Sequence, residues 1–167
     1  DFLLANNIKG NFLNDFNSGA YLLGRAHPNI KVFIDGRTEA YGSVFFKQYK
    51  DLWENGNKEV FDRVIKDYNI TGALLNSSRS QIPVPLLELL YNHPDWALVY
   101  FNYDALVFLK RVEQNQEIIN QFSINLEEWK APPINMFKLG ANVYEPIDYY
   151  YRGFTLESLG LADQAME

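Results

Sequence analysis

Two short apolar runs near the start of the chain constrain its fold more than any other feature. They span Asn11–Leu13 and Lys31–Ile34, and each leads into an acidic residue, Asp15 or Asp35. A glycine and a helix-like stretch follow each acid. Short apolar runs that alternate with helical segments are typical of parallel strands joined by crossover helices. We therefore predict that both runs are strands of one sheet, with their carboxyl ends at the same edge.

The rest of the chain continues this alternation. Helices are predicted over residues 20–25, 39–53, 58–68 and 83–91. Strands are predicted over residues 71–75, 97–101 and 105–109. The last two are separated only by Asn102-Tyr103-Asp104, which favours a hairpin. The predicted fold class is α/β: a three-layer sandwich with a mostly parallel sheet and an antiparallel C-terminal hairpin, then an α-helical tail.

Changes in sequence character predict three parts. Residues 1–112 form the α/β domain, and residues 113–146 form a linker with irregular or helical structure that contains Ala131-Pro132-Pro133. Residues 147–167 resume a helical pattern. The chain opens at Asp1 without an initiator methionine and stops inside a helical pattern at Glu167, so we expect it to be a piece of a longer protein.

Composition excludes several classes of function. The net charge is −6 and no lysine or arginine cluster is present, which argues against a nucleic-acid partner. The absence of cysteine excludes disulfides, thiolate metal sites and cysteine nucleophiles. No stretch of about 18–20 consecutive apolar residues occurs, so we expect the chain itself to be soluble.

The last twenty residues carry small and aromatic residues at repeat-like intervals. The positions are Tyr149, Gly153, Leu156, Gly160 and Ala165. They resemble the start of a tetratricopeptide repeat, in which small residues let two helices pack closely and a second glycine makes the turn between them. Arg152 stands where that pattern has a leucine, and is a departure from it. The resemblance implies a truncated repeat that takes part in protein binding.

Four segments of the α/β part resemble a known family. They are LNDFNSGAYL, KVFIDGRTEAYG, ITGALL and WALVYFNYDALVFLK, and the resemblance covers residues 1–111. They resemble the region after the last membrane span in relatives of the dolichyl-phosphate-mannose-type protein mannosyltransferases, which are glycosyltransferases that use lipid-linked sugars. The resemblance implies an extracytoplasmic accessory domain of a membrane-anchored protein, with a protein or glycan partner. Relatives often have an acidic pair in the hairpin turn, where this chain has Asn102-Tyr103-Asp104. Their catalytic acid belongs to a loop beside the first membrane spans, which this sequence lacks.

The carboxyl edge of the predicted sheet gathers a polar set of residues. The candidate ligand-binding residues are Asp15, Asn17, Gly19, Asp35, Arg37, Glu39 and Tyr41. In one interpretation Arg37 binds a phosphate or carboxylate, the amides of residues 17–19 support an anion, and Asp15 and Asp35 offer oxygen ligands to a divalent cation. In the other, Arg37 neutralises Asp15 and Asp35 in a structural network. Apart from that cation, no cofactor is expected.

Three functions therefore remain open. The leading hypothesis is an accessory binding or positioning domain without turnover of its own. The first alternative is a small soluble enzyme or ligand-binding domain that acts on a sugar phosphate or other anion at Asp15, Asp35 and Arg37. The second alternative is a protein-interaction module that acts through tetratricopeptide repeats.

Overall fold

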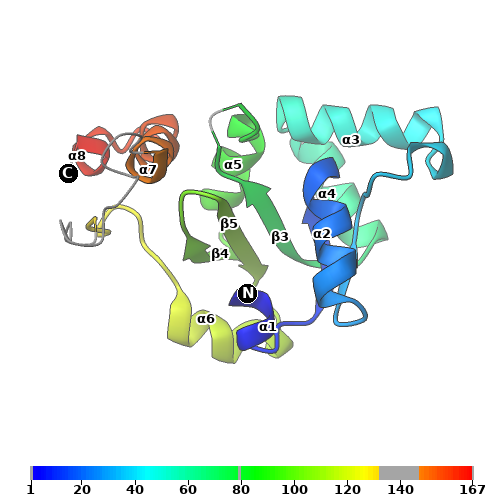
Figure 1. Ribbon diagram of the computed structural model, residues 1–167, viewed down its shortest axis with the longest axis horizontal. Coiled ribbons are helices and arrows are strands. Elements are labelled where there is room, and N and C mark those ends of the chain that lie inside the picture. Colours follow the sequence, from blue (N-terminus) through cyan, green and yellow to red (C-terminus); the bar gives the residue numbers. More distant parts are fainter. Residues whose placement is uncertain (1, 79, 132–146, 167) are drawn as a thin grey trace.

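The computed structural model describes residues 2–78, 80–131 and 147–166. It confirms the predicted α/β class: a five-stranded mixed sheet lies between two layers of helices, and a helical tail follows (Figure 1). The strands are β1 (Gly10–Asn14), β2 (Ile30–Val32), β3 (Ile70–Asn76), β4 (Trp96–Phe101) and β5 (Ala105–Lys110). Their order across the sheet is β2-β1-β3-β5-β4.

The sheet is parallel at one end and antiparallel at the other. β1 pairs in parallel with both β2 and β3, whereas β5 is antiparallel to β3 and β4. The predicted hairpin of β4 and β5 is therefore confirmed. The register places Phe12 opposite Gly72, and a Cβ at Gly72 would lie 2.3 Å from the Phe12 ring. Glycine at this position therefore makes room for a buried aromatic ring.

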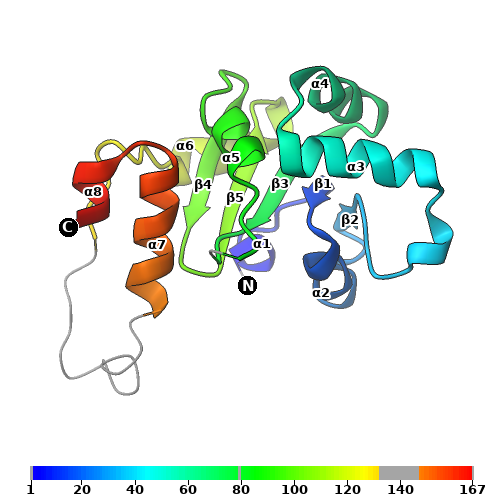
Figure 2. The same cartoon turned by 90° about the horizontal axis from the view of Figure 1, so that it is seen from above.

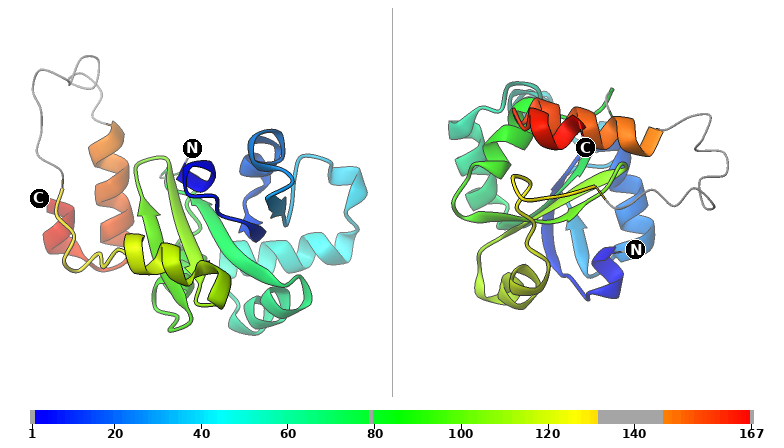
Figure 3. Two further views of the ribbon diagram at one scale, coloured as in Figure 1. Left: turned by 90° about the horizontal axis from the view of Figure 1, so that it is seen from below. Right: turned by 90° about the vertical axis from the view of Figure 1, so that its left-hand side faces the viewer.

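Alternate residues of the strands build a core on each face of the sheet. One face is covered by α3 (Ser43–Asn55), α4 (Lys58–Asp67) and α5 (Val84–Tyr91). α7 (Ile147–Ser158) lies beside the edge strand β4 and contributes Leu156 to the same core (Figure 2). The other face is covered by α1 (Phe2–Ala5), α2 (Phe16–Ala26) and α6 (Gln116–Phe122). Figures 2 and 3 show these two helical layers on opposite sides of the strands.

Two predicted helices differ in their bounds. The first begins at Phe16, four residues before the predicted start, because Asp15 rather than residues 17–19 caps it. The predicted helix over 39–53 is divided into a short 3₁₀ helix, η1 (Thr38–Ala40), and α3, whose N-cap is Gly42.

The first part of the predicted connection after the hairpin packs against the sheet. It begins with a 3₁₀ helix, η2 (Glu113–Asn115), followed by α6. Asn115 is buried, and its Nδ2 donates to the backbone oxygens of Thr71 and Lys110, at 2.9 Å each. Residues 132–146 of this connection lie outside the described residues. A second short helix, α8 (Ala162–Met166), follows α7.

Candidate functional site

Asp15 directly follows β1 and caps α2. Its Oδ1 accepts hydrogen bonds from the backbone N–H groups of Asn17, at 2.8 Å, and Ser18, at 2.9 Å. Its Oδ2 accepts a short hydrogen bond from Ser18 Oγ. The residue is buried. Oδ1 therefore satisfies two of the N–H groups that the first turn of a helix leaves unpaired, and Oδ2 is bonded to the Ser18 hydroxyl. The Asn17 amide that was predicted to receive an anion already donates to Asp15.

Asn14, which sequence reasoning missed, joins the ends of β1 and β2. It is fully buried, and its Nδ2 donates to the backbone oxygens of Asp15 and Ile34, at 2.8 Å each. Its Oδ1 accepts from the backbone N–H of Phe33, at 2.8 Å. One side chain thus hydrogen-bonds to backbone groups after both β1 and β2, and it supplies a donor to the Ile34 oxygen beyond the last ladder position of β2. The signal in the sequence was a polar residue at the end of an apolar strand, directly before an acid.

Gly19 brings α2 against the loop that follows β2. A Cβ at this position would lie 2.1 Å from the backbone oxygen of Ile34 and 2.7 Å from Cα of Asp35. Both neighbours are backbone atoms, so they cannot move aside without shifting the loop. Gly19 is therefore a close-packing glycine that sets the position of Asp35, rather than a residue that leaves space for a ligand.

Asp35 forms an ion pair with Arg37. Arg37 Nη2 lies 2.5 Å from Asp35 Oδ2, and Arg37 Nε lies 3.0 Å from Oδ1. The backbone N–H of Arg37 donates to the same Oδ1, at 2.9 Å. The Asp35 side chain is 2% exposed, whereas that of Arg37 is 68% exposed. The hydrogen bond from Arg37 lowers the pKa of Asp35 from 3.8 to about 2, and the pair raises the pKa of Arg37. The buried carboxylate is therefore ionised at neutral pH, and its cation lies at the surface.

Tyr41 supports the same loop. Its hydroxyl oxygen accepts a hydrogen bond from the backbone N–H of Asp35, at 3.1 Å, and its ring stacks on Phe45 with centroids 4.9 Å apart. Burial raises the pKa of the Tyr41 hydroxyl, which therefore stays protonated. Glu39 lies exposed in η1.

The cluster thus divides into two separately satisfied parts. Asp15 belongs to the start of α2, whereas Asp35, Arg37 and Tyr41 fix the loop after β2. Arg37 pairs with Asp35, and the Asp15 carboxylate is taken up by the first turn of the helix. Among the described residues, no group of three or more histidine, cysteine, aspartate or glutamate side chains is arranged to hold a metal ion. The oxygen atoms proposed for a cation already accept hydrogen bonds from this chain.

The C-terminal helices place the repeat-like residues at one helical hairpin. Gly160 has a left-handed backbone, with φ 76°, and makes the turn between α7 and α8. A Cβ on Gly153 would lie 3.4 Å from the backbone oxygen of Ala165, so the two helices approach closely there. Leu156 is buried against the sheet. Arg152 is the departure from the repeat pattern. Its Nη2 donates to Oδ1 of Asn102, in the turn between β4 and β5, at 2.5 Å.

The outer side of this helical hairpin carries a groove of about 920 Å³. Its lining includes Tyr149, Phe154 and Met166. Met166 is 80% exposed, and Tyr150 beside it is 47% exposed. Contiguous apolar surface of this kind is uncommon on monomeric proteins and typically marks an interaction site.

Comparisons of this chain with protein-family models, curated proteins and solved structures find no match. The resemblances to the mannosyltransferase relatives and to the tetratricopeptide repeat therefore stay predictions. Within residues 2–78, 80–131 and 147–166, no helix has the length and apolar character needed to cross a membrane.

Proposed function

We propose that this chain is an accessory domain that binds or positions a partner within a larger membrane-anchored, glycosyltransferase-like protein. It would lie on the extracytoplasmic side and have no turnover of its own. The membrane anchor and the location come from the sequence resemblance. The binding role is supported by the arrangement of the described residues, and a protein segment fits this arrangement better than a glycan does.

The observation that carries the proposal is the groove along the α7–α8 hairpin. The wall of the groove is aromatic and apolar, from Tyr149, Phe154 and Met166, and Glu157 and Ser158 add polar groups. Leu156 of α7 belongs to the core cluster on the α3–α5 side of the sheet, and Arg152 hydrogen-bonds to Asn102 of the β4–β5 turn. The α/β body therefore acts as a rigid base that presents the groove. A rigid apolar groove suits the apolar face of a protein helix.

The polar cluster at the sheet edge supports a role without catalysis. A general acid or base needs a carboxylate that is free to exchange a proton with a substrate. The oxygens of Asp15 accept from the first turn of α2, and those of Asp35 accept from Arg37. The pKa of Asp35, about 2, also lies far below the range useful for proton transfer near neutral pH.

Selection of displayed peptides against the chain tests the binding role. We expect selected peptides to carry apolar residues at helical spacing and to lose about tenfold or more in affinity when Met166→Asp puts a charge in the groove. Val44→Asp is the matched control, because Val44 is 83% exposed on α3, away from the groove. Fluorescence anisotropy of a labelled peptide measures both variants. Equal affinity for the two variants would refute the groove as the binding site.

The membrane anchor is tested separately, by sequencing the source gene on both sides of this chain. Several upstream runs of about 20 apolar residues in the same reading frame are the expected result. A start codon immediately before Asp1, with no such runs, would remove the membrane hypothesis.

One observation favours a second candidate function, the binding of an anion at Arg37. The Arg37 side chain is 68% exposed while Asp35 holds its guanidinium in place, so the guanidinium can donate to a phosphate. A sugar phosphate should then raise the melting temperature of the wild-type chain and of Arg37→Lys, but not of Arg37→Ala. No shift at millimolar ligand in the wild type would exclude this function.

A further inference from the structure

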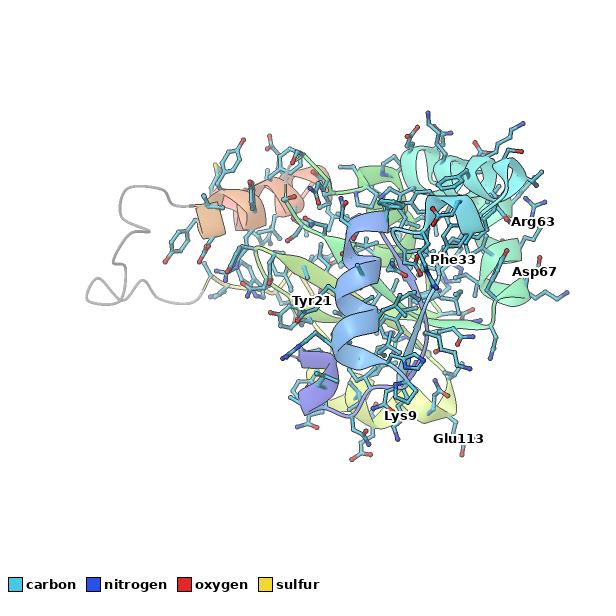
Figure 4. All side chains as sticks on the ribbon, turned by 45° about the vertical axis from the view of Figure 1, so that its right-hand side comes forward. Lys9, Tyr21, Phe33, Arg63, Asp67 and Glu113 are labelled. Atoms are coloured by element: carbon cyan, nitrogen blue, oxygen red, sulfur yellow. The ribbon has the colours of Figure 1, made fainter. Side chains whose placement is uncertain are left out.

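A second cavity lies between α2 and α1, over β3 and β5, and Ser18 connects it to the polar cluster. It has a volume of about 210 Å³ and is enclosed by α1, α2 and the adjoining ends of β3, β4 and β5. The residues that form its floor are Leu22, Leu74 and Val107. Figure 4 labels Tyr21 on α2, and the Tyr21 side chain lines the mouth of this cavity.

The cavity lies on the α2 face of the sheet, next to a place where α/β sheets often bind ligands, and Leu74 of β3 is the residue that it shares with the strands concerned. β1 leads into α2 on one face of the sheet, whereas the neighbouring strand β3 leads into α5 on the other face. The chain therefore departs in opposite directions from two adjacent parallel strands. Open α/β sheets bind ligands at the carboxyl ends of such strands. The predicted cluster lies instead between β1 and the edge strand β2.

The walls of the cavity are apolar and partly aromatic. Leu22 and Val107 are nearly fully buried at its base, and the rings of Phe2 and Tyr100 pack with centroids 5.0 Å apart. At the mouth, Leu4 is 41% exposed and Tyr21 is 54% exposed. Two large side chains thus leave apolar surface in contact with water at the entrance. A ligand that covers them gains the free energy of burying that surface.

Three residues with polar side chains line the cavity, namely Ser18, Arg25 and Asp104. The Ser18 hydroxyl already donates to Asp15, and Asp104 offers a carboxylate to a ligand. Asp104 lines the cavity from the β4–β5 turn, and its side chain is exposed. An exposed carboxylate beside an apolar cavity accepts a hydrogen bond from a ligand donor. Apolar cavities of about 150 Å³ hold a single benzene ring. A cavity of 210 Å³ therefore has room for one ring and a small substituent.

We propose that this cavity binds a small molecule that consists of one apolar ring with a hydrogen-bond donor. The ring lies over Leu22, Leu74 and Val107, and the donor reaches the Asp104 carboxylate. This site is separate from the α7–α8 groove and does not depend on the proposed function.

The test uses p-cresol, a ring with a hydroxyl donor, and toluene, the same ring without the donor. Saturation-transfer NMR and methyl chemical-shift titration of the whole chain measure the binding. We expect p-cresol to bind with Kd on the order of 1 mM and to shift the methyl signals of Leu22, Leu74 and Val107. Toluene should bind about tenfold more weakly, since it cannot hydrogen-bond to the carboxylate.

Two variants separate the parts of the proposal. Ala105→Trp fills the cavity from β5 and should abolish binding of both probes. Asp104→Asn should weaken p-cresol about tenfold and leave toluene unchanged. Val44→Trp adds the same large side chain on α3, far from the cavity, and should leave binding unchanged.

Three results would overturn the proposal. One is p-cresol shifts on methyl groups elsewhere in the wild type, a measurement that does not depend on whether Ala105→Trp folds. Another is equal binding to Ala105→Trp when its circular dichroism matches the wild type. Equal affinity of p-cresol and toluene would overturn the assigned role of Asp104.

Discussion

The two sides of α2 differ in how completely the chain satisfies its own side chains. On the β2 side, Asp15, Asn14 and Asp35 are buried, and each of them hydrogen-bonds to neighbouring groups of the chain. On the β3 side, a cavity of about 210 Å³ remains, with exposed Leu4 and Tyr21 at its mouth. On the side with the polar motif, the polar side chains are therefore already hydrogen-bonded within the chain. On the side without a motif, a cavity is left.

This contrast separates two uses of polar residues at a sheet edge. Loops at the ends of strands leave backbone groups unpaired, and a buried unpaired group costs about 1–3 kcal/mol. Acids, amides and glycines at strand ends are therefore needed for folding even where no ligand binds. A polar motif is evidence for a binding site only when its atoms can still hydrogen-bond to a ligand. The carboxylate oxygens of Asp15 and Asp35 already accept hydrogen bonds from this chain.

The largest effect is expected at Gly19. Gly19→Ala should destabilise the chain by about 3 kcal/mol, because the new Cβ would lie 2.1 Å from the backbone oxygen of Ile34. Urea denaturation measures the loss. Gly24→Ala is the control in the same helix, since nothing lies within 4 Å of a Cβ there, and it should stabilise by about 0.5 kcal/mol. Similar values for the two variants would show that α2 does not pack closely on the β2 side.

Asn14→Ala should produce the next largest loss, about 2 kcal/mol. The substitution removes the hydrogen bond to the buried backbone oxygen of Ile34, whereas the Asp15 oxygen keeps the N–H of Gly19, at 3.2 Å, and the N–H of Phe33 keeps the oxygen of Phe12, at 3.0 Å. Asn11→Ala on the same strand is the matched control: Asn11 makes one exposed hydrogen bond, to the backbone oxygen of Tyr68, and should cost less than about 1 kcal/mol. Thermal and urea unfolding check both. An equal loss of stability in the two variants would mean that the hydrogen bonds of Asn14 do not hold the ends of β1 and β2 together.

Much of the fold could be predicted from the sequence because its signals are local. The apolar runs at 71–75, 97–101 and 105–109 each became a strand, and the three-residue connection after Phe101 became the predicted hairpin turn. Gly160 took the left-handed conformation expected of a turn between helices. The start of α2 was misplaced because Asp15, Ser18 and Gly19 all suit a helix start, and propensity alone does not choose between them.

The candidate site was less predictable because it depends on contacts across the sheet. The proximity of Asp35 and Arg37 could be expected from their spacing, but the burial of Asp35 depends on the approach of Gly19 from another element. Asn14 bonds to residues about twenty positions away, which no local pattern reveals. The cavity over Leu74 and Val107 is formed by gaps between elements, and gaps leave no signal in a sequence.

A smaller effect is expected from the Asp35–Arg37 pair. Because the pKa of Asp35 is lowered from 3.8 to about 2, the pair stabilises the fold fully above pH 3.8 and loses this contribution as the pH falls toward 2. The exposure of Arg37 limits the magnitude through solvent screening. Carboxyl ¹³C NMR titration should show the pKa of Asp35 rise toward 3.8 in Arg37→Gln. An unchanged pKa would mean that the ion pair does not hold the loop.

The smallest effect is expected at Tyr49, the second support of the α2 start. Its hydroxyl oxygen accepts from the backbone N–H of Phe16, at 3.3 Å, so Tyr49→Phe should cost about 0.5 kcal/mol at neutral pH. Burial raises the pKa of Tyr49 from 10.0 to about 12. The unfolded chain therefore loses this proton first, and the wild type loses stability as the pH rises from 10 toward 12. Tyr49→Phe lacks this loss, so urea unfolding of both proteins should show their stability difference shrink over that range. If the stability difference between the two proteins stays constant over this pH range, the Tyr49 hydroxyl is exposed to water. Tyr49 would then not support the start of α2, and Asp15 alone would do so.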